Sequence, residues 1–169
     1  MLFRSTHPHF DHLSDEDIKI IETENTIFIA PKACGSLKKK NHFHELNVGE
    51  KFDSDNINFE AVFAYNTNKN FHTKEMKFIG IILTIENKRI YHAGDTDVIE
   101  EMKTYGELDV SMLPISGTYV MTAEEGVVAA NEYLKSKYYI PMHFDRIVGD
   151  LNMAKHFIEN VKNGVLPEF

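Results

Sequence analysis

The chain has 169 residues, of which 43% are hydrophobic and 26% charged, and its formal net charge is −8. This balance excludes disordered and collagen-like chains, and the negative charge argues against a general nucleic-acid binder, which needs clustered lysine and arginine. The apolar runs are shorter than the roughly 18 residues of a membrane span, and no apolar leader segment is visible at the N-terminus. With a single cysteine and no route to an intrachain disulfide, we expect one cytoplasmic domain over residues 1–169.

Hydrophobic periodicity and capping residues predict strands alternating with helices. Strands are expected at residues 1–5, 26–30, 57–65, 78–85, 88–91, 109–113 and 138–141. Helices are expected at 15–24 after Ser14, at 123–135 after Thr122, and at 150–163 before Gly164. Pro31 predicts a turn or short helix that Gly35 interrupts, and Glu86 and Asn87 form a hairpin turn. This alternation indicates an α/β or α+β fold with a mostly buried sheet.

The most informative segment is residues 7–12, which read His-Pro-His-Phe-Asp-His just before the first predicted helix. Residues two apart on an extended segment point the same way, so His7 and His9 can bind one cation. Asp11 and His12 lie where the chain turns into the helix, so they can face a second cation beside the first. Imidazole and carboxylate ligands together suit zinc, iron or manganese.

Two later segments carry residues of the same chemical type. In residues 91–97 a strand ends, Gly94 permits a tight turn, and Asp95 emerges, where its two oxygens can bridge two metals. His92, three residues before Asp95, is predicted to be structural or to support a ligand from behind, and not to bind the metal itself. A buried strand also ends at Pro141, and His143 follows it. We predict Asp95 and His143 as further metal ligands.

Together and in this order, the three segments resemble the metallo-β-lactamase superfamily. The closer similarity is to small bacterial and archaeal metal-dependent hydrolases akin to ascorbate-6-phosphate lactonase, which residues 64–75 and 113–126 also resemble. The resemblance implies an αββα sandwich with two divalent metal ions at one edge, zinc first, with manganese or iron as alternatives. It implies these ligands: His7 and His9 for the first metal, Asp11, His12 and His143 for the second, and Asp95 between them.

The position of the metal loop near residue 7 differs from the family pattern, in which several strands come first. The resemblance therefore predicts an N-terminally truncated sandwich that lacks part of its first sheet. An exposed sheet edge or core face is prone to association. We accordingly expect a homo-oligomer.

The chain also differs from the family pattern at the third ligand of the first metal. Much of the family has a histidine after the strand predicted at 57–65, whereas this chain has Asn66. A neutral amide is a poor zinc ligand beside imidazole. His72 follows six residues later in an asparagine-rich loop that can fold back. We predict His72 as the ligand, with Asn66 as a direct or water-mediated contact in the alternative.

These residues predict a dinuclear metal-dependent hydrolase acting on a small molecule, with neither nucleic acid nor membrane as a partner. A metal-bridging hydroxide would attack a lactone, ester or phosphoester, while Asp11 orients the hydroxide and takes its proton. Candidate contacts to an anionic substrate are Asn66, Lys74, Tyr119 and Arg146. The alternative is a non-catalytic or weakly active metal-binding remnant of such a hydrolase.

Overall fold

The structure is a computed structural model that describes residues 1–54 and 57–167. A three-stranded sheet is formed by β1 (Leu2–Arg4), β2 (Ile27–Ala30) and β3 (Phe43–Glu45), all parallel and in that order. The helix α1 (Asp15–Ile21) and the 3₁₀ helix η1 (Gly35–Lys39) cover one face of this sheet. Phe28 and Ala30 point toward these helices while Ile29 between them points to the opposite face, as strand alternation requires.

A six-stranded sheet makes up the centre of the molecule. Its strands, in spatial order, are β4 (Lys51–Ser54), β5 (Ile57–Phe63), β6 (Ile79–Ile85), β7 (Lys88–His92), β8 (Glu107–Pro114) and β9 (Lys135–Met142). The first four strands pair antiparallel, whereas β7, β8 and β9 are parallel. Strands β5, β7, β8 and β9 therefore all end at the same edge of the sheet.

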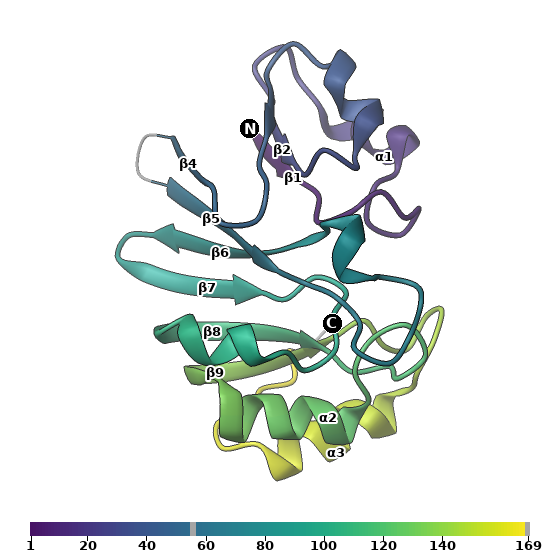
Figure 1. The fold of residues 1–169 in the computed structure, drawn as a ribbon, viewed down its shortest axis with the longest axis vertical. Coiled ribbons are helices and arrows are strands. Elements are labelled where there is room, and N and C mark those ends of the chain that lie inside the picture. The colour runs from purple at the N-terminus through teal and green to yellow at the C-terminus, as the bar shows by residue number, and fades with distance from the viewer. Residues whose placement is uncertain (55–56, 168–169) are drawn as a thin grey trace.

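The remaining helices follow the strands along the chain. They are the 3₁₀ helices η2 (Lys74–Met76) and η3 (Glu100–Thr104), the α-helices α2 (Ala123–Val128) and α3 (Leu151–Asn160), and the π-helical turn η4 (Ala129–Tyr133). Figure 1 shows α1 at one end of the molecule and α2 and α3 at the other, with the strands between them. None of the helices in the described ranges combines the length and apolar character needed to cross a bilayer.

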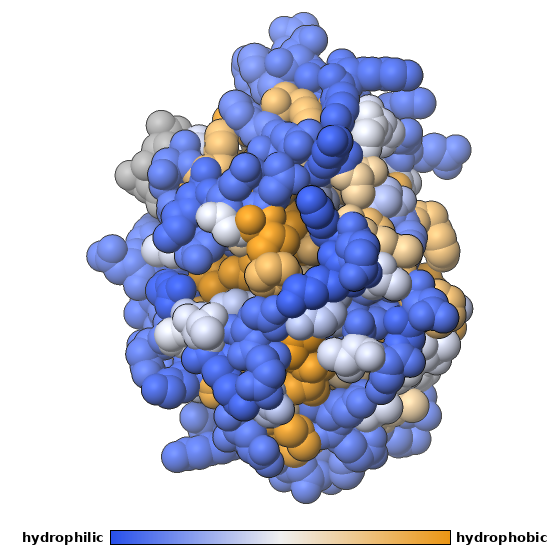
Figure 2. All heavy atoms as spheres, in the orientation of Figure 1, coloured by the Kyte–Doolittle hydropathy of each residue, from blue (hydrophilic) through white to orange (hydrophobic). Residues whose placement is uncertain are grey.

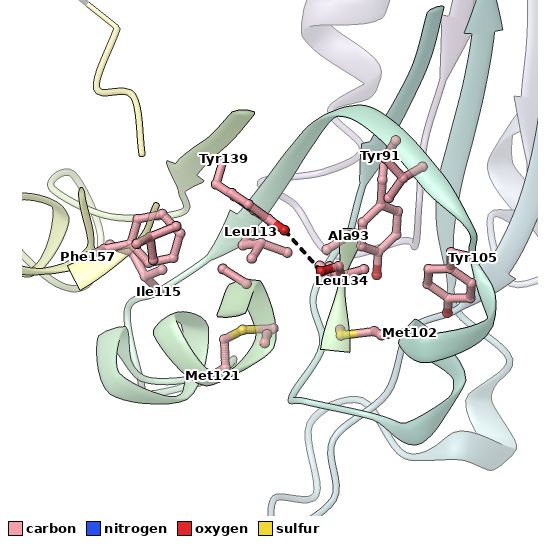
Figure 3. Close-up of a cluster of buried hydrophobic side chains, with 14 of the residues drawn as sticks. Tyr91, Ala93, Met102, Tyr105, Leu113, Ile115, Met121, Leu134, Tyr139 and Phe157 are labelled. Atoms are coloured by element: carbon pink, nitrogen blue, oxygen red, sulfur yellow. Dashed lines mark hydrogen bonds between the residues drawn. The ribbon is translucent and has the colours of Figure 1, made fainter. Parts of the chain in front are cut away.

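Three buried clusters separate the layers. One lies between α1 and the small sheet, and a second lies between the two sheets, where Ile29 meets Phe59 and Ile81. The third and largest lies between the six-stranded sheet and α2 and α3; there Tyr139 Oη donates a hydrogen bond to the Leu134 carbonyl at 3.1 Å (Figure 3). Much of the face seen in Figure 2 is hydrophilic, with apolar residues in view mainly near its middle. The predicted αββα order of layers is confirmed.

Several predicted boundaries are wrong, and the causes are local. The helix expected at 123–135 gives way at Ala129 to a π turn, in which Leu134 N donates to the Ala129 carbonyl. Strand β9 then begins at Lys135, three residues before the predicted strand. The first helix ends at Ile21 and the last at Asn160, both short of their predicted ends. Gly35 begins η1 instead of interrupting a helix.

Other local predictions are confirmed. Thr122 forms a complete capping box with Glu125 at the start of α2. The hairpin turn between β6 and β7 has Glu86 and Asn87 at φ values of 48° and 62°. Two positive φ angles are typical of the two-residue turns whose twist matches that of antiparallel strands.

The variant Phe157→Ala is expected to lower the free energy of unfolding by about 3–5 kcal/mol, because it removes a fully buried ring and leaves a cavity. The ring packs closely on Gly126, where even an added Cβ would lie 3.3 Å from it. Urea unfolding followed by circular dichroism measures the change. Ile20→Ala, at a side chain that is 81% exposed, is the control and should be nearly neutral. Equal losses in the two variants would contradict the prediction.

Candidate metal centre

Several loops meet at the edge where β5, β7, β8 and β9 end. Because these strands share one direction, the segments that follow them leave the sheet side by side. These segments carry His72 after β5, Asp95 after β7 and His143 after β9. The loop after β1 reaches the same edge, since Ile79 N donates to the Thr6 carbonyl at 3.1 Å. Sheet topology thus brings together histidines that are up to 136 residues apart in the chain.

Gly94 allows the chain to turn Asp95 into this region. Its φ is +66°, and an added Cβ would lie 2.8 Å from the Ile79 carbonyl oxygen. A side chain here would therefore meet both backbone strain and a steric clash. The Gly94 amide also donates to His92 Nδ1 at 3.2 Å, which gives His92 a structural contact in the turn.

The Asp95 carboxylate lies at the centre of the cluster and is only 3% exposed. Its Oδ1 is 3.1 Å from His12 Nε2. Its Oδ2 lies near three other imidazoles: 3.3 Å from His72 Nε2, 3.5 Å from His143 Nε2 and 3.8 Å from His7 Nε2. Four imidazole nitrogens therefore point at one buried carboxylate.

The donor atoms form two groups on either side of Asp95. One group is His7, His9 and His72, and the other is Asp11, His12 and His143, with the donor atoms of each group within 4.8 Å of one another. His72 Nε2 is 3.1 Å from His9 Nδ1, and His143 Nε2 is 3.4 Å from Asp11 Oδ2. The structure thus brings all seven predicted ligands together.

The state of the donor atoms fits bound cations. Among the described residues, His7 Nε2 is buried and makes no hydrogen bond, an arrangement that costs about 1–3 kcal/mol unless another partner is present. Burial and the neighbouring His12 lower the pKa of His7 to about 2, so its imidazole is neutral and its lone pair available. Although burial alone would raise it, the contact with His12 lowers the pKa of Asp95 to about 2. Neutral imidazole and ionised carboxylate are the forms that bind metal.

Asn66 lies behind His72, on the side away from Asp95. Its Oδ1 faces both the backbone amide and Nδ1 of His72, at 3.1 and 3.2 Å, and its Nδ2 donates to the Tyr119 carbonyl at 2.9 Å. That carbonyl also lies 3.2 Å from His72 Nδ1. Because both neighbours of Nδ1 are acceptors, the proton sits on Nδ1 and Nε2 presents its lone pair to the centre.

Hydroxyl groups that the sequence did not single out lie behind other predicted ligands in the same way. Thr6 Oγ1 lies 3.0 Å from His7 Nδ1 and 3.3 Å from His12 Nδ1. Ser116 Oγ lies 3.1 Å from His143 Nδ1. Polar groups behind metal-binding histidines fix the ring orientation. Of these hydroxyl groups, only that of Thr6 could be suspected from the sequence, because Thr6 stands directly before His7.

The predicted substrate contacts are arranged differently. The Asn66 amide is used by His72 and Tyr119, and the Tyr119 ring packs edge-on against Phe71 at a centroid distance of 4.8 Å. Lys74 Nζ is 2.7 Å from Glu101 Oε1, so its charge is paired. Arg146 is exposed, three residues after His143. Their roles toward a substrate stay predictions.

Comparison with known proteins agrees with this geometry. Residues 5–144 match the family model described as "Beta-lactamase superfamily domain". The chain is 30% identical to the metal-dependent hydrolase YtkL of Bacillus subtilis, with 95% of this chain and 74% of YtkL covered. A protein from Parabacteroides distasonis described as a metal-dependent hydrolase superposes with a TM-score of 0.84 at 29% identity, covering 99% of this chain and 76% of that one. Igni18, a metallo hydrolase from Ignicoccus hospitalis, shares the fold with a TM-score of 0.76 at 24% identity, over 99% of this chain and 76% of its own. The chain belongs to the metallo-β-lactamase superfamily.

Proposed function

We propose that this metal-dependent hydrolase of the metallo-β-lactamase superfamily holds two divalent cations and cleaves a neutral carboxylic ester or lactone. The observation that carries the proposal is the pair of ligand groups that flank the buried Asp95 carboxylate. His7, His9 and His72 would hold one cation, Asp11, His12 and His143 the other, and Asp95 would serve both. Zinc suits this set best, with manganese and iron as alternatives.

When bound, two such cations would lower the pKa of a water molecule toward neutrality and polarise a substrate carbonyl. The residues themselves divide the remaining tasks. Four imidazoles enclose the Asp95 carboxylate. Its negative charge would stabilise the bound cations, and it is not accessible to accept a proton from water. The Asp11 side chain is 24% exposed, and its Oδ2 lies 3.5 Å from His12 Nε2 and 3.4 Å from His143 Nε2. These contacts and its exposure support Asp11 as the carboxylate that would orient a water molecule at the open side and accept its proton.

Charge and polarity around the site favour an ester over a phosphoester. A phosphoester carries negative charge and calls for arginine or lysine to bind it. Two of the three lysines between β5 and β6 are already paired, Lys69 with Asp97 and Lys74 with Glu101, and the third, Lys77, is exposed. Apolar rings adjoin the ligands instead: Phe10 is 75% exposed and Phe71 is 48% exposed. The anionic-substrate alternative rests on the exposed Arg146.

Removal of metal by a chelator is expected to abolish turnover, and reloading to two zinc ions per chain is expected to restore it. The test is metal analysis combined with turnover of a panel that contains a γ-lactone, p-nitrophenyl butyrate and bis-p-nitrophenyl phosphate. The ester and lactone are expected to react. His156→Ala is the matched control, because this exposed histidine lies 3.7 Å from Glu124 and outside the cluster.

The outcomes separate the competing hypotheses. Turnover of the phosphodiester alone would overturn the ester assignment and favour the anionic alternative. Two bound metals without turnover of any substrate would favour a non-catalytic remnant. Fewer than two metals in the reloaded protein would contradict the dinuclear centre itself.

A further inference from the structure

A second buried carboxylate lies two residues after Asp95 and outside the candidate ligand set. The Asp97 side chain is 2% exposed, and its Oδ1 accepts a hydrogen bond from Lys69 Nζ at 2.6 Å. The Lys69 side chain is itself only 16% exposed. The other oxygen, Oδ2, accepts from the Thr67 backbone amide at 2.8 Å and lies 3.4 Å from its hydroxyl. Asp97 thus contacts the middle of the loop that carries His72.

The same turn also fixes the start of that loop. The Tyr65 carbonyl accepts from Asp97 N at 2.9 Å, and Tyr65 N donates to Thr96 Oγ1 at 3.1 Å. Between Tyr65 and His72 the chain has neither helix nor strand to hold it. Its conformation therefore depends on these contacts and on the hydrogen bonds of Asn66 to His72 and Tyr119.

The electrostatics make the Lys69–Asp97 contact different from a surface ion pair. Loss of the counterion of a buried carboxylate is strongly unfavourable, so the contact between Lys69 and Asp97 holds the loop and the turn together. The nearby Lys74–Glu101 pair is a useful contrast, since the Lys74 side chain is 47% exposed. Exposed pairs of this kind contribute little to stability.

We propose that the Lys69–Asp97 ion pair is a positioning pair for the first metal. It holds the loop so that His72 Nε2 faces Asp95 and His9 before a cation binds. One turn after β7 thereby supplies both Asp95, a ligand, and Asp97, the anchor for the loop that brings another ligand. This inference rests on the proposed dinuclear centre.

Zinc binding to the metal-free protein tests the proposal without relying on turnover. Lys69→Met keeps the aliphatic stem and removes the charge. We expect the zinc affinity of the site of His7, His9 and His72 to fall by about 10–100-fold, the loss usual when a group that supports a ligand is removed. The zinc affinity of the other site should not change. Lys74→Met removes the lysine of the exposed Lys74–Glu101 pair and is the matched control for zinc binding, with both zinc affinities expected to remain as in the parent. Affinities are measured by competition with a chromophoric chelator.

A double variant distinguishes positioning from general stability. Asp97→Asn combined with Lys69→Met leaves no buried charge unpaired, so thermal stability should recover relative to Lys69→Met alone. If the pair positions the loop, the first zinc site stays weak although stability has recovered. Recovery of zinc affinity together with stability, or equal weakening of both sites in Lys69→Met, would overturn the proposal. If the parent protein binds fewer than two zinc ions, the dinuclear centre fails independently of this pair.

Discussion

The variant Asp95→Asn is expected to lose measurable turnover and to bind both metals at least about 100-fold more weakly. A factor of about 100 is the largest loss of metal affinity usually seen when a residue that supports a ligand is removed. The reason is the position of the carboxylate. Four imidazole nitrogens lie within 3.8 Å of its two oxygens, and the two ligand groups flank it. Loss of one negative charge at this point is felt at both cation positions.

The measurement is metal content after dialysis at limiting zinc, followed by turnover of the ester that the parent protein cleaves. Asp109→Asn is the matched control. This carboxylate pairs with Lys88 and Lys137 at the surface, so its loss should change neither metal content nor rate. An Asp95→Asn protein that kept two metals and the parent rate would show that Asp95 does not lie between them.

The candidate ligands could be predicted in part from short segments of the sequence. His7 and His9 are two residues apart on an extended chain, and Asp95 follows a strand and a glycine whose φ is positive. Such local geometry is encoded in residue spacing. Convergence of the segments follows from a general property of sheets, since strands that share a direction end at one edge.

The supporting groups were not predictable in the same way. Ser116 and His143 are 27 residues apart, and Lys69 and Asp97 are 28 apart, so nothing in their local sequence pairs them. These contacts depend on side-chain directions that only the packed loops define.

Parts of the fold were unpredictable for a similar reason. The strands β3 and β4 lie at sheet edges, have three and four residues, and carry no long apolar pattern. The π-helical turn η4 lies at the junction with β9, and hydrophobic periodicity alone does not predict such a turn.

The variants His72→Ala and Asn66→Ala are expected to separate a ligand from the residue that orients it. His72→Ala removes a donor nitrogen that lies 3.3 Å from Asp95 Oδ2 and 3.1 Å from His9 Nδ1. We expect this protein to retain only one zinc ion at limiting metal. Asn66→Ala leaves that nitrogen in place and removes one of the two acceptors near His72 Nδ1, while the Tyr119 carbonyl remains.

The Asn66 variant should therefore still bind two zinc ions when metal is in excess, with affinity at one site reduced by about 10–100-fold. Zinc titration of the two variants gives each stoichiometry and affinity directly. Two tightly bound ions in His72→Ala, together with loss of one in Asn66→Ala at excess zinc, would assign the ligand to the asparagine and leave His72 free to contact substrate.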